Sequence, residues 1–255
     1  FANVTKPEDY KAFLAGEEKN AAHIFGAHER TVNGVKGVLF NVWAPKALSV
    51  SVVGEFNKYD GRVHLMERIE DTGVFELFIP GLAAGCGYMY EIKRQGKGTT
   101  RKLDPVSRQI SSVPIIASVV SDENMPDSYA WNDGLWMIKR KKEAGKKKPV
   151  TVYEVSLTDW LKEKSADELV DFVKQEGYTH VCFLPVAEYL NEEMNGYSTL
   201  GYFAVTHRIG GSDAFKKLVD DCHNAGIGVI IDWNGAYFGT EAKGLYDFDG
   251  ADAYG

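Results

Sequence analysis

The run GIGVIID, residues 226–232, most constrains the fold, because a series of branched apolar residues ends in one aspartate, Asp232. Strands that are apolar throughout are usually covered on both faces, as in parallel α/β sheets. A polar residue at the carboxyl end of such a strand lies where barrel enzymes place their chemistry. The run therefore predicts a buried parallel strand with a candidate functional carboxylate at its end.

From residue 150 onwards, strands and helices alternate in the sequence pattern. We predict three strands and two helices, at 150–157, 165–177, 179–186, 212–226 and 227–232. Ser165 followed by Glu168 is a capping box, which marks the start of the first helix. Strand, helix and strand in this order imply parallel pairing with right-handed crossovers.

The first part of the chain has a different period. Residues 1–30 are polar and predicted to be helical, whereas apolar residues alternate from residue 34 to about 120. Short strands bounded by Gly, Pro and Asn are predicted at 37–45, 49–56, 73–82 and 88–93. Such spacing is typical of a β-sandwich.

These patterns divide the chain into four segments: a helical N-terminal segment (1–30), a β-sandwich (31–120), a linker (121–149) and an α/β segment (150–255). The linker contains KRKKEAGKKK, whose seven basic residues repel one another and predict a solvated stretch. A site for an anionic partner is the alternative interpretation.

Composition limits the partners. The chain has 255 residues, of which 44% are hydrophobic, and a net charge of −7, which does not favour a nucleic-acid partner. No apolar run approaches the roughly 20 residues that span a bilayer, so we expect no membrane association. Three cysteines without CxxC spacing argue against a disulfide framework and fit a cytoplasmic protein. The six histidines show no ligand spacing, so we expect no metal and no other cofactor.

Several stretches together resemble glycogen branching enzymes, which are members of the α-amylase family. In the α/β segment these are VYEVSLTDW, FLPVAEY, GYSTLGYFAVTHRIG and DWNGAYF. The stretch 42–61 resembles the glycogen-binding-type sandwich that precedes the barrel in that family. The resemblance implies an immunoglobulin-like all-β sandwich followed by a (β/α)8-type barrel, with only its first three strands present.

The implied activity is 1,4-α-glucan branching, in which an α-1,4 linkage is cut and the chain is transferred to a 6-hydroxyl with retention. Retention requires two carboxyl groups about 5–5.5 Å apart. By the resemblance, both would follow Gly255, so we expect no catalytic residue in this chain and no activity of the chain alone. The alternative is a non-catalytic α-glucan-binding or scaffolding protein; a debranching or trehalose-forming relative is a third reading.

The resemblance also implies two sets of glucan-binding residues. In the barrel segment these are Tyr197, Tyr202, Asp232, Trp233 and Tyr237. There, Asp232 would orient an arginine beside the nucleophile and Tyr197 would stack under the sugar; a loop anchor is the alternative for Asp232. In the sandwich, Phe56 and Tyr59 would stack on glucan or would merely pack the turn. Tyr59 stands where the family usually has Trp.

Four positions of the cleft depart from the family pattern. Ser156 replaces a His, Tyr237 stands where a substrate-contacting His is expected, and Asn195 and Ser198 flank Tyr197 in place of a Trp and a Gln. These exchanges fit relaxed selection on catalysis or a shifted substrate.

A partial barrel would leave surface without partners. Three strands cannot close a barrel of eight, and its outer strands would be open edges that invite pairing. We expect the inner faces of Val152, Val181 and Val229 to lack partners, and the chain to self-associate.

Overall fold

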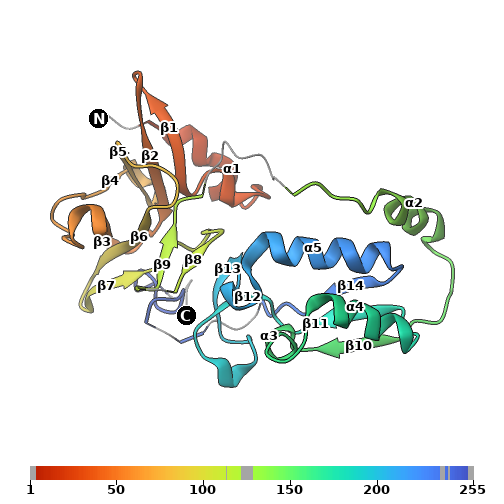
Figure 1. Cartoon of the computed structure of the whole chain (residues 1–255). Coiled ribbons are helices and arrows are strands. Elements are labelled where there is room, and N and C mark those ends of the chain that lie inside the picture. The colour runs from red at the N-terminus through yellow and green to blue at the C-terminus, as the bar shows by residue number, and fades with distance from the viewer. Residues whose placement is uncertain (1–3, 113, 122–128, 236–238, 241, 252–255) are drawn as a thin grey trace. The chain divides into compact units, whose positions relative to one another are not determined.

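The computed structural model describes residues 4–112, 114–121, 129–235, 239–240 and 242–251 (Figure 1). By their contacts, the residues form two compact units. The sandwich unit comprises 1–126, 199–204 and 238–255, and the α/β unit comprises 127–198 and 205–237. Each unit contains stretches that are distant in sequence, whereas each of the four predicted segments is one continuous stretch. The boundaries of the four segments as domains stay a prediction.

The sandwich unit consists of two antiparallel sheets, with strand orders β1-β2-β5-β4 and β3-β6-β9-β8, and with β7 paired to β6. The strands are β1 (Gly26–Val32), β2 (Val35–Trp43), β3 (Ala47–Gly54), β4 (Glu67–Arg68), β5 (Val74–Pro80), β6 (Gly87–Arg94), β7 (Gly98–Lys102), β8 (Ile110–Ser111) and β9 (Ala117–Val119). The four strands predicted from the alternating pattern correspond to β2, β3, β5 and β6, so the sandwich is confirmed.

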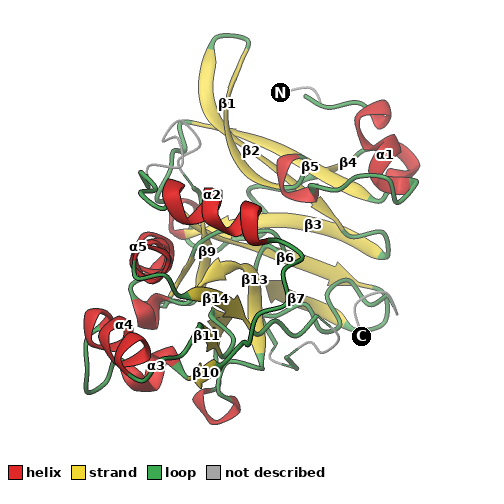
Figure 2. Ribbon diagram, turned by 90° about the vertical axis from the view of Figure 1, so that its right-hand side faces the viewer, coloured by secondary structure: helices red, strands yellow, loops and turns green. Residues whose placement is uncertain are grey.

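The prediction of a helical segment up to residue 30 was wrong at its end. Residues from Gly26 form β1, which pairs along its whole length with β2 in the hairpin visible in Figure 2. Residues 26–32 form a strand despite their polar composition, because pairing with β2 provides hydrogen-bond partners for their backbone amide and carbonyl groups. The helical turns before it are short: Pro7–Tyr10, α1 (Lys11–Leu14) and Ala21–His23.

The core of the sandwich lies between the inner faces of its two sheets. It contains Val38, Phe40 and Val42 of β2 and Tyr88, Tyr90 and Ile92 of β6. Phe248 is fully buried in the same cluster. Polar contacts hold its flanks, since Asp249 accepts a hydrogen bond of 2.9 Å from the Lys46 amide and Asp247 pairs with Arg94 at 2.6 Å. Phe248 is therefore part of the sandwich core, although it lies far in sequence from the strands that surround it.

The α/β unit contains a three-stranded parallel sheet in the order β10 (Val152–Val155), β11 (His180–Phe183) and β14 (Gly228–Ile231). Its helices are α2 (Gly134–Glu143), α3 (Leu157–Trp160), α4 (Ala166–Gln175) and α5 (Gly211–Asn224). A further strand of this unit is β12 (Ala187–Tyr189), whereas β13 (Thr199–Val205) lies almost wholly in the stretch 199–204 of the sandwich unit. The three predicted strands, their parallel pairing and the helices α4 and α5 are confirmed.

The capping box predicted for α4 is present. The Ser165 hydroxyl accepts from the Glu168 amide at 3.2 Å, and the Glu168 carboxylate accepts from the Ser165 amide at 2.7 Å. Two amide groups that the helix itself leaves unpaired are thus satisfied. Leu169 and Val173 of α4 then face a core shared with Phe183 and Leu218.

Helices α4 and α5 cover one face of the parallel sheet (Figures 1 and 2). Val181 has no exposed surface and Val229 packs against the same core, so the expectation that these two lack partners was wrong. Val152 does lie on the other face and is 43% exposed. The reason is the alternation along a strand: Val152 is level with His180, and therefore points away from Val181. In the described residues β10 and β14 are the outer strands; self-association stays a prediction.

The predicted linker contains a helix. Residues 139–143 of its basic run form the second half of α2, in which no side chain is buried. The helix is attached to α5 by His223, whose ring stacks on Trp136 with centroids 3.7 Å apart and bonds to Asp133 at 2.7 Å. The basic side chains remain in solvent, as like charges require.

Substitution of Val181 by Ala should destabilise the α/β unit by about 2 kcal/mol, because it removes two fully buried methyl groups and leaves a cavity. Val152→Ala, one strand away on the uncovered face, is the matched control and should change stability by less than about 0.5 kcal/mol. Urea denaturation followed by circular dichroism measures both. Equal losses would contradict the assignment of the two faces.

Candidate functional site

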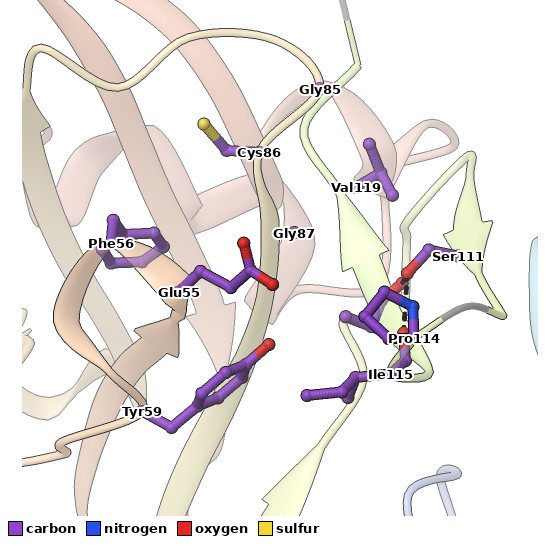
Figure 3. Close-up of a pocket in the computed structure, with 11 residues that line it drawn as sticks. Glu55, Phe56, Tyr59, Gly85, Cys86, Gly87, Ser111, Pro114, Ile115 and Val119 are labelled. Carbon is purple, nitrogen blue, oxygen red and sulfur yellow. Dashed lines mark hydrogen bonds between the residues drawn. The ribbon is translucent and has the colours of Figure 1, made fainter.

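A pocket of about 370 Å³ lies in the sandwich unit, beside the turn that follows β3 (Figure 3). The Tyr59 hydroxyl and the Glu55 carboxylate are directed into the same space, and Ile115 and Pro114 form the opposite side. Its other lining residues are Phe56, Gly85, Cys86, Gly87, Ser111, Ala117 and Val119. A half-buried ring with a polar group next to it and an apolar wall opposite is suited to a ligand that has both apolar and hydroxyl-bearing faces.

The turn that carries Tyr59 is held by backbone contacts. Asn57 accepts a hydrogen bond from the Gly54 amide at 3.0 Å and donates to the Val52 carbonyl at 2.8 Å. The Tyr59 amide donates to the Gly54 carbonyl at 2.9 Å. Lys58 and Tyr59 both have left-handed backbone angles, with φ of 54° and 58°. The turn is therefore tight, and it fixes where the Tyr59 side chain leaves the backbone.

Phe56 lines the pocket and also packs against the sandwich core. Its ring lies 5.5 Å from that of His64, whose pKa burial lowers. A side chain at Gly54 would meet the Phe56 ring at 2.4 Å, so the glycine makes room for it. Phe56 thus contributes to the packing of the turn, and Tyr59, which also packs against the buried cluster that contains Val53 and Met89, contributes its hydroxyl to the pocket.

A second candidate site lies at the carboxyl end of the parallel sheet. Asp232 directly follows β14, and its amide donates to the Phe183 carbonyl at 2.9 Å. The Tyr197 hydroxyl donates a short hydrogen bond to the Asp232 carboxylate. This bond, together with burial and the nearby charges of Asp232 and Glu154, raises the pKa of Tyr197 to about 12. The structure therefore brings together Tyr197 and Asp232, two of the predicted glucan-binding residues, through a hydrogen bond from the phenol to the carboxylate.

Two residues that sequence analysis did not single out belong to this second site. Glu154 and Cys182 are level with each other on β10 and β11, on the face that the helices leave uncovered. Burial, and then the charges of Glu154 and Asp232, raise the pKa of the Cys182 thiol. The alternation in VYEV could have identified Glu154, because it places Glu154 on the opposite face of the strand from the buried Val155.

The loop that presents Tyr197 is closely packed. A side chain at Gly196, where φ is +86°, would meet the Pro185 carbonyl at 2.6 Å. The buried Glu188 accepts from Arg208 at 2.8 Å, and Arg208 also donates to the Tyr189 carbonyl at 3.0 Å. These contacts join β12, which precedes the loop, to the helical turn His207–Ile209 that follows β13.

The remaining predicted residues are distributed differently. Tyr202 is half-buried in β13, within the stretch 199–204 of the sandwich unit, and burial raises its pKa. Trp233 follows Asp232 and is 63% exposed. Tyr237 lies outside the described residues.

Three of the positions that depart from the family pattern lie within the described residues. Ser156 begins α3 and accepts from the Asp159 amide at 3.3 Å. Asn195 is exposed with a left-handed φ of 48°, a conformation that asparagine tolerates. Ser198 is buried.

Across the described part of the chain, no group of three or more His, Cys, Asp or Glu is placed to hold a metal ion. None of the described helices combines the length and the apolar character that crossing a bilayer requires.

Comparison with known proteins identifies relatives over nearly the whole chain. Residues 24–107 match carbohydrate-binding module 48, the isoamylase N-terminal domain. The 1,4-alpha-glucan branching enzyme GlgB of Methylococcus capsulatus is 42% identical over 258 residues, which cover 96% of this chain and 34% of that enzyme. GlgB of Nitrosococcus oceani has the same identity and coverage, and GlgB of Gloeobacter violaceus is 41% identical. The chain is similar to 1,4-α-glucan branching enzymes over nearly its whole length. It spans about a third of the length of these relatives.

Two solved structures have a similar fold. A putative alpha amylase from Salmonella typhimurium aligns with a TM-score of 0.62 at 24% identity, over 86% of this chain and 34% of that one. The pneumococcal glycogen-degrading virulence factor SpuA aligns with a TM-score of 0.57 at 21% identity, over 82% of this chain and 27% of that one. At these identities the likeness concerns the fold alone.

Replacing Asp232 by Asn should lower the pKa of Tyr197 from about 12 towards 10, because a neutral amide no longer stabilises the protonated phenol. Absorbance at 295 nm between pH 9 and 11 should then show one more tyrosine ionising in Asp232→Asn than in the wild-type chain. Tyr197→Phe should titrate like the wild type in this range. Identical curves for Asp232→Asn and the wild type would contradict the hydrogen bond.

Proposed function

We propose that the sandwich unit binds α-glucan at the pocket that Tyr59 and Phe56 line. The observation that carries this proposal is the position of the pocket: its two aromatic side chains lie within the residues 24–107 that match a carbohydrate-binding module. Tyr59 offers a ring face for a pyranose, and the Glu55 carboxylate beside it can accept hydrogen bonds from sugar hydroxyls. A linear glucan that passes the pocket would bury the ring without filling a closed cavity.

We further propose that the parallel sheet forms the first three strands of a (β/α)8-type barrel. The order of β10, β11 and β14, the helices on one face and Asp232 at the carboxyl end all support this. Glu154 and Cys182 would then face the barrel interior. Asp232, Tyr197 and Trp233 would position the glucan, and Tyr202 and Tyr237 stay predicted glucan-binding residues.

The activity that fits this arrangement is 1,4-α-glucan branching, carried out by a branching-enzyme-like protein with the two required carboxyl groups on later strands. The hydrogen bond to Asp232 fixes the Tyr197 hydroxyl at the carboxyl end of the sheet, where its ring could stack on a sugar. The three cysteines are free, which suits a cytoplasmic protein of glycogen metabolism. A non-catalytic glucan-binding protein is the second candidate, favoured by the exchanges at Ser156 and Ser198.

The chain should migrate more slowly in native gels that contain glycogen than in gels without it. Tyr59→Ala should weaken this retardation severalfold, because it removes the half-buried ring and its hydroxyl from the pocket. Tyr246→Ala is the matched control, since Tyr246 is a 46% exposed aromatic residue of the same unit outside the pocket. Unretarded migration of the folded wild-type chain would rule out glucan binding by the sandwich.

The 255-residue chain by itself should form no new α-1,6 linkages in amylose. Retaining transfer needs two carboxyl groups about 5–5.5 Å apart, and Asp232, bonded to Tyr197, cannot supply both. New branches are measured by treating the product with a debranching enzyme and counting the released chains. Branching clearly above a buffer control would contradict this expectation, whereas glucan binding without branching would agree with it.

A further inference from the structure

Arg101 of β7 contacts Tyr59 in two ways. Its Nη2 donates to the Tyr59 carbonyl at 2.9 Å, and its guanidinium carbon lies 5.8 Å from the centre of the Tyr59 ring. Arg101 is in turn paired with Glu91, which stands directly opposite on β6 and accepts from its Nε at 2.9 Å. One guanidinium therefore joins the β6–β7 hairpin to the backbone and the ring of the residue that lines the pocket.

The turn needs such a contact. Non-glycine residues with left-handed φ are uncommon, and Lys58 and Tyr59 are two in succession. Conformations of this kind persist only where the surroundings hold them. The turn also packs closely on the ion pair, because a side chain at Gly61 would meet Glu91 Oε1 at 2.0 Å.

We propose that Arg101, oriented by Glu91, is a positioning residue that fixes the Tyr59 ring for glucan and so sets the affinity of the pocket; this rests on the glucan binding proposed above. A planar guanidinium holds its donors in fixed directions, so it can bond a carboxylate and a carbonyl at once while it faces a ring, whereas the ammonium group of a lysine is a point charge on a flexible stem. Fixing an aromatic side chain before binding removes part of the ordering cost that association otherwise carries.

A neighbouring ion pair supplies the matched control. Arg62 pairs with Asp60 at 2.7 Å in the same turn, and its side chain is 90% exposed. The pair lies one residue beyond Tyr59, and none of its hydrogen bonds goes to Tyr59. Arg62→Ala thus removes one guanidinium charge from the turn itself without removing a contact to the ring.

The test measures the dissociation constant for maltoheptaose by calorimetry, with the melting temperature of each variant as a check on folding. Arg101→Ala should weaken binding about two- to tenfold, the equivalent of one side chain left unfixed. Arg101→Lys should recover part of this loss, and Arg62→Ala should bind like the wild type. Glu91→Gln, which keeps the arginine but not its charged partner, should show a smaller loss in the same direction.

The double variant separates positioning from direct contact with the sugar. If Arg101 acts through Tyr59, then adding Arg101→Ala to Tyr59→Ala should cause no further loss of affinity. A further loss would show that Arg101 binds glucan itself and would overturn the proposal. Wild-type affinity of both Arg101→Ala and Glu91→Gln, with Tyr59→Ala weakened, would overturn it too. Wild-type affinity of Tyr59→Ala would instead overturn the proposed glucan site.

Discussion

The covered face of the parallel sheet is the constraint on which the α/β unit depends. Val181 and Phe183 of β11 have no exposed surface, because α4 and α5 bury them together with Val173 and Leu218. Since successive residues of a strand point to opposite faces, burying these two places His180 and Cys182 on the other face. The packing of apolar side chains on one face of the sheet therefore determines which polar side chains lie on the other face.

The sandwich unit depends on a comparable buried constraint. Asp104 has almost no exposed surface, and it accepts hydrogen bonds from Tyr88 at 2.6 Å and Tyr90 at 3.0 Å. Its own amide donates to Ser118, and the Val106 amide completes the set at 2.9 Å. Burial raises the pKa of Asp104 although these bonds lower it. A buried carboxyl with several donors links β6 to the chain after β7 and secures the hairpin that presents Arg101.

Much of the fold followed from local patterns. Alternation from residue 34 onwards predicted β2, β3, β5 and β6, and the Ser165 capping box predicted the start of α4, because these signals act over a few residues. β1 was missed since its polar sequence becomes a strand only against β2. The role of Phe248 was missed for the same reason, as its partners lie far away in sequence. The resemblance to branching enzymes came from motifs, and relatives at 42% identity confirm it.

The sequence by itself determined the succession of a sandwich and a strand–helix unit, the position of Asp232 at the end of an apolar strand, and the aromatic residues Phe56 and Tyr59 in a turn. Tertiary structure alone decided that Asp232 bonds to Tyr197, that Val181 is covered while Val152 is not, and that Arg101 reaches Tyr59. The physical reason is range. Strand alternation and helix capping are set by neighbouring residues, whereas hydrogen bonds and burial between residues about 30 or 40 positions apart exist only once the strands have paired.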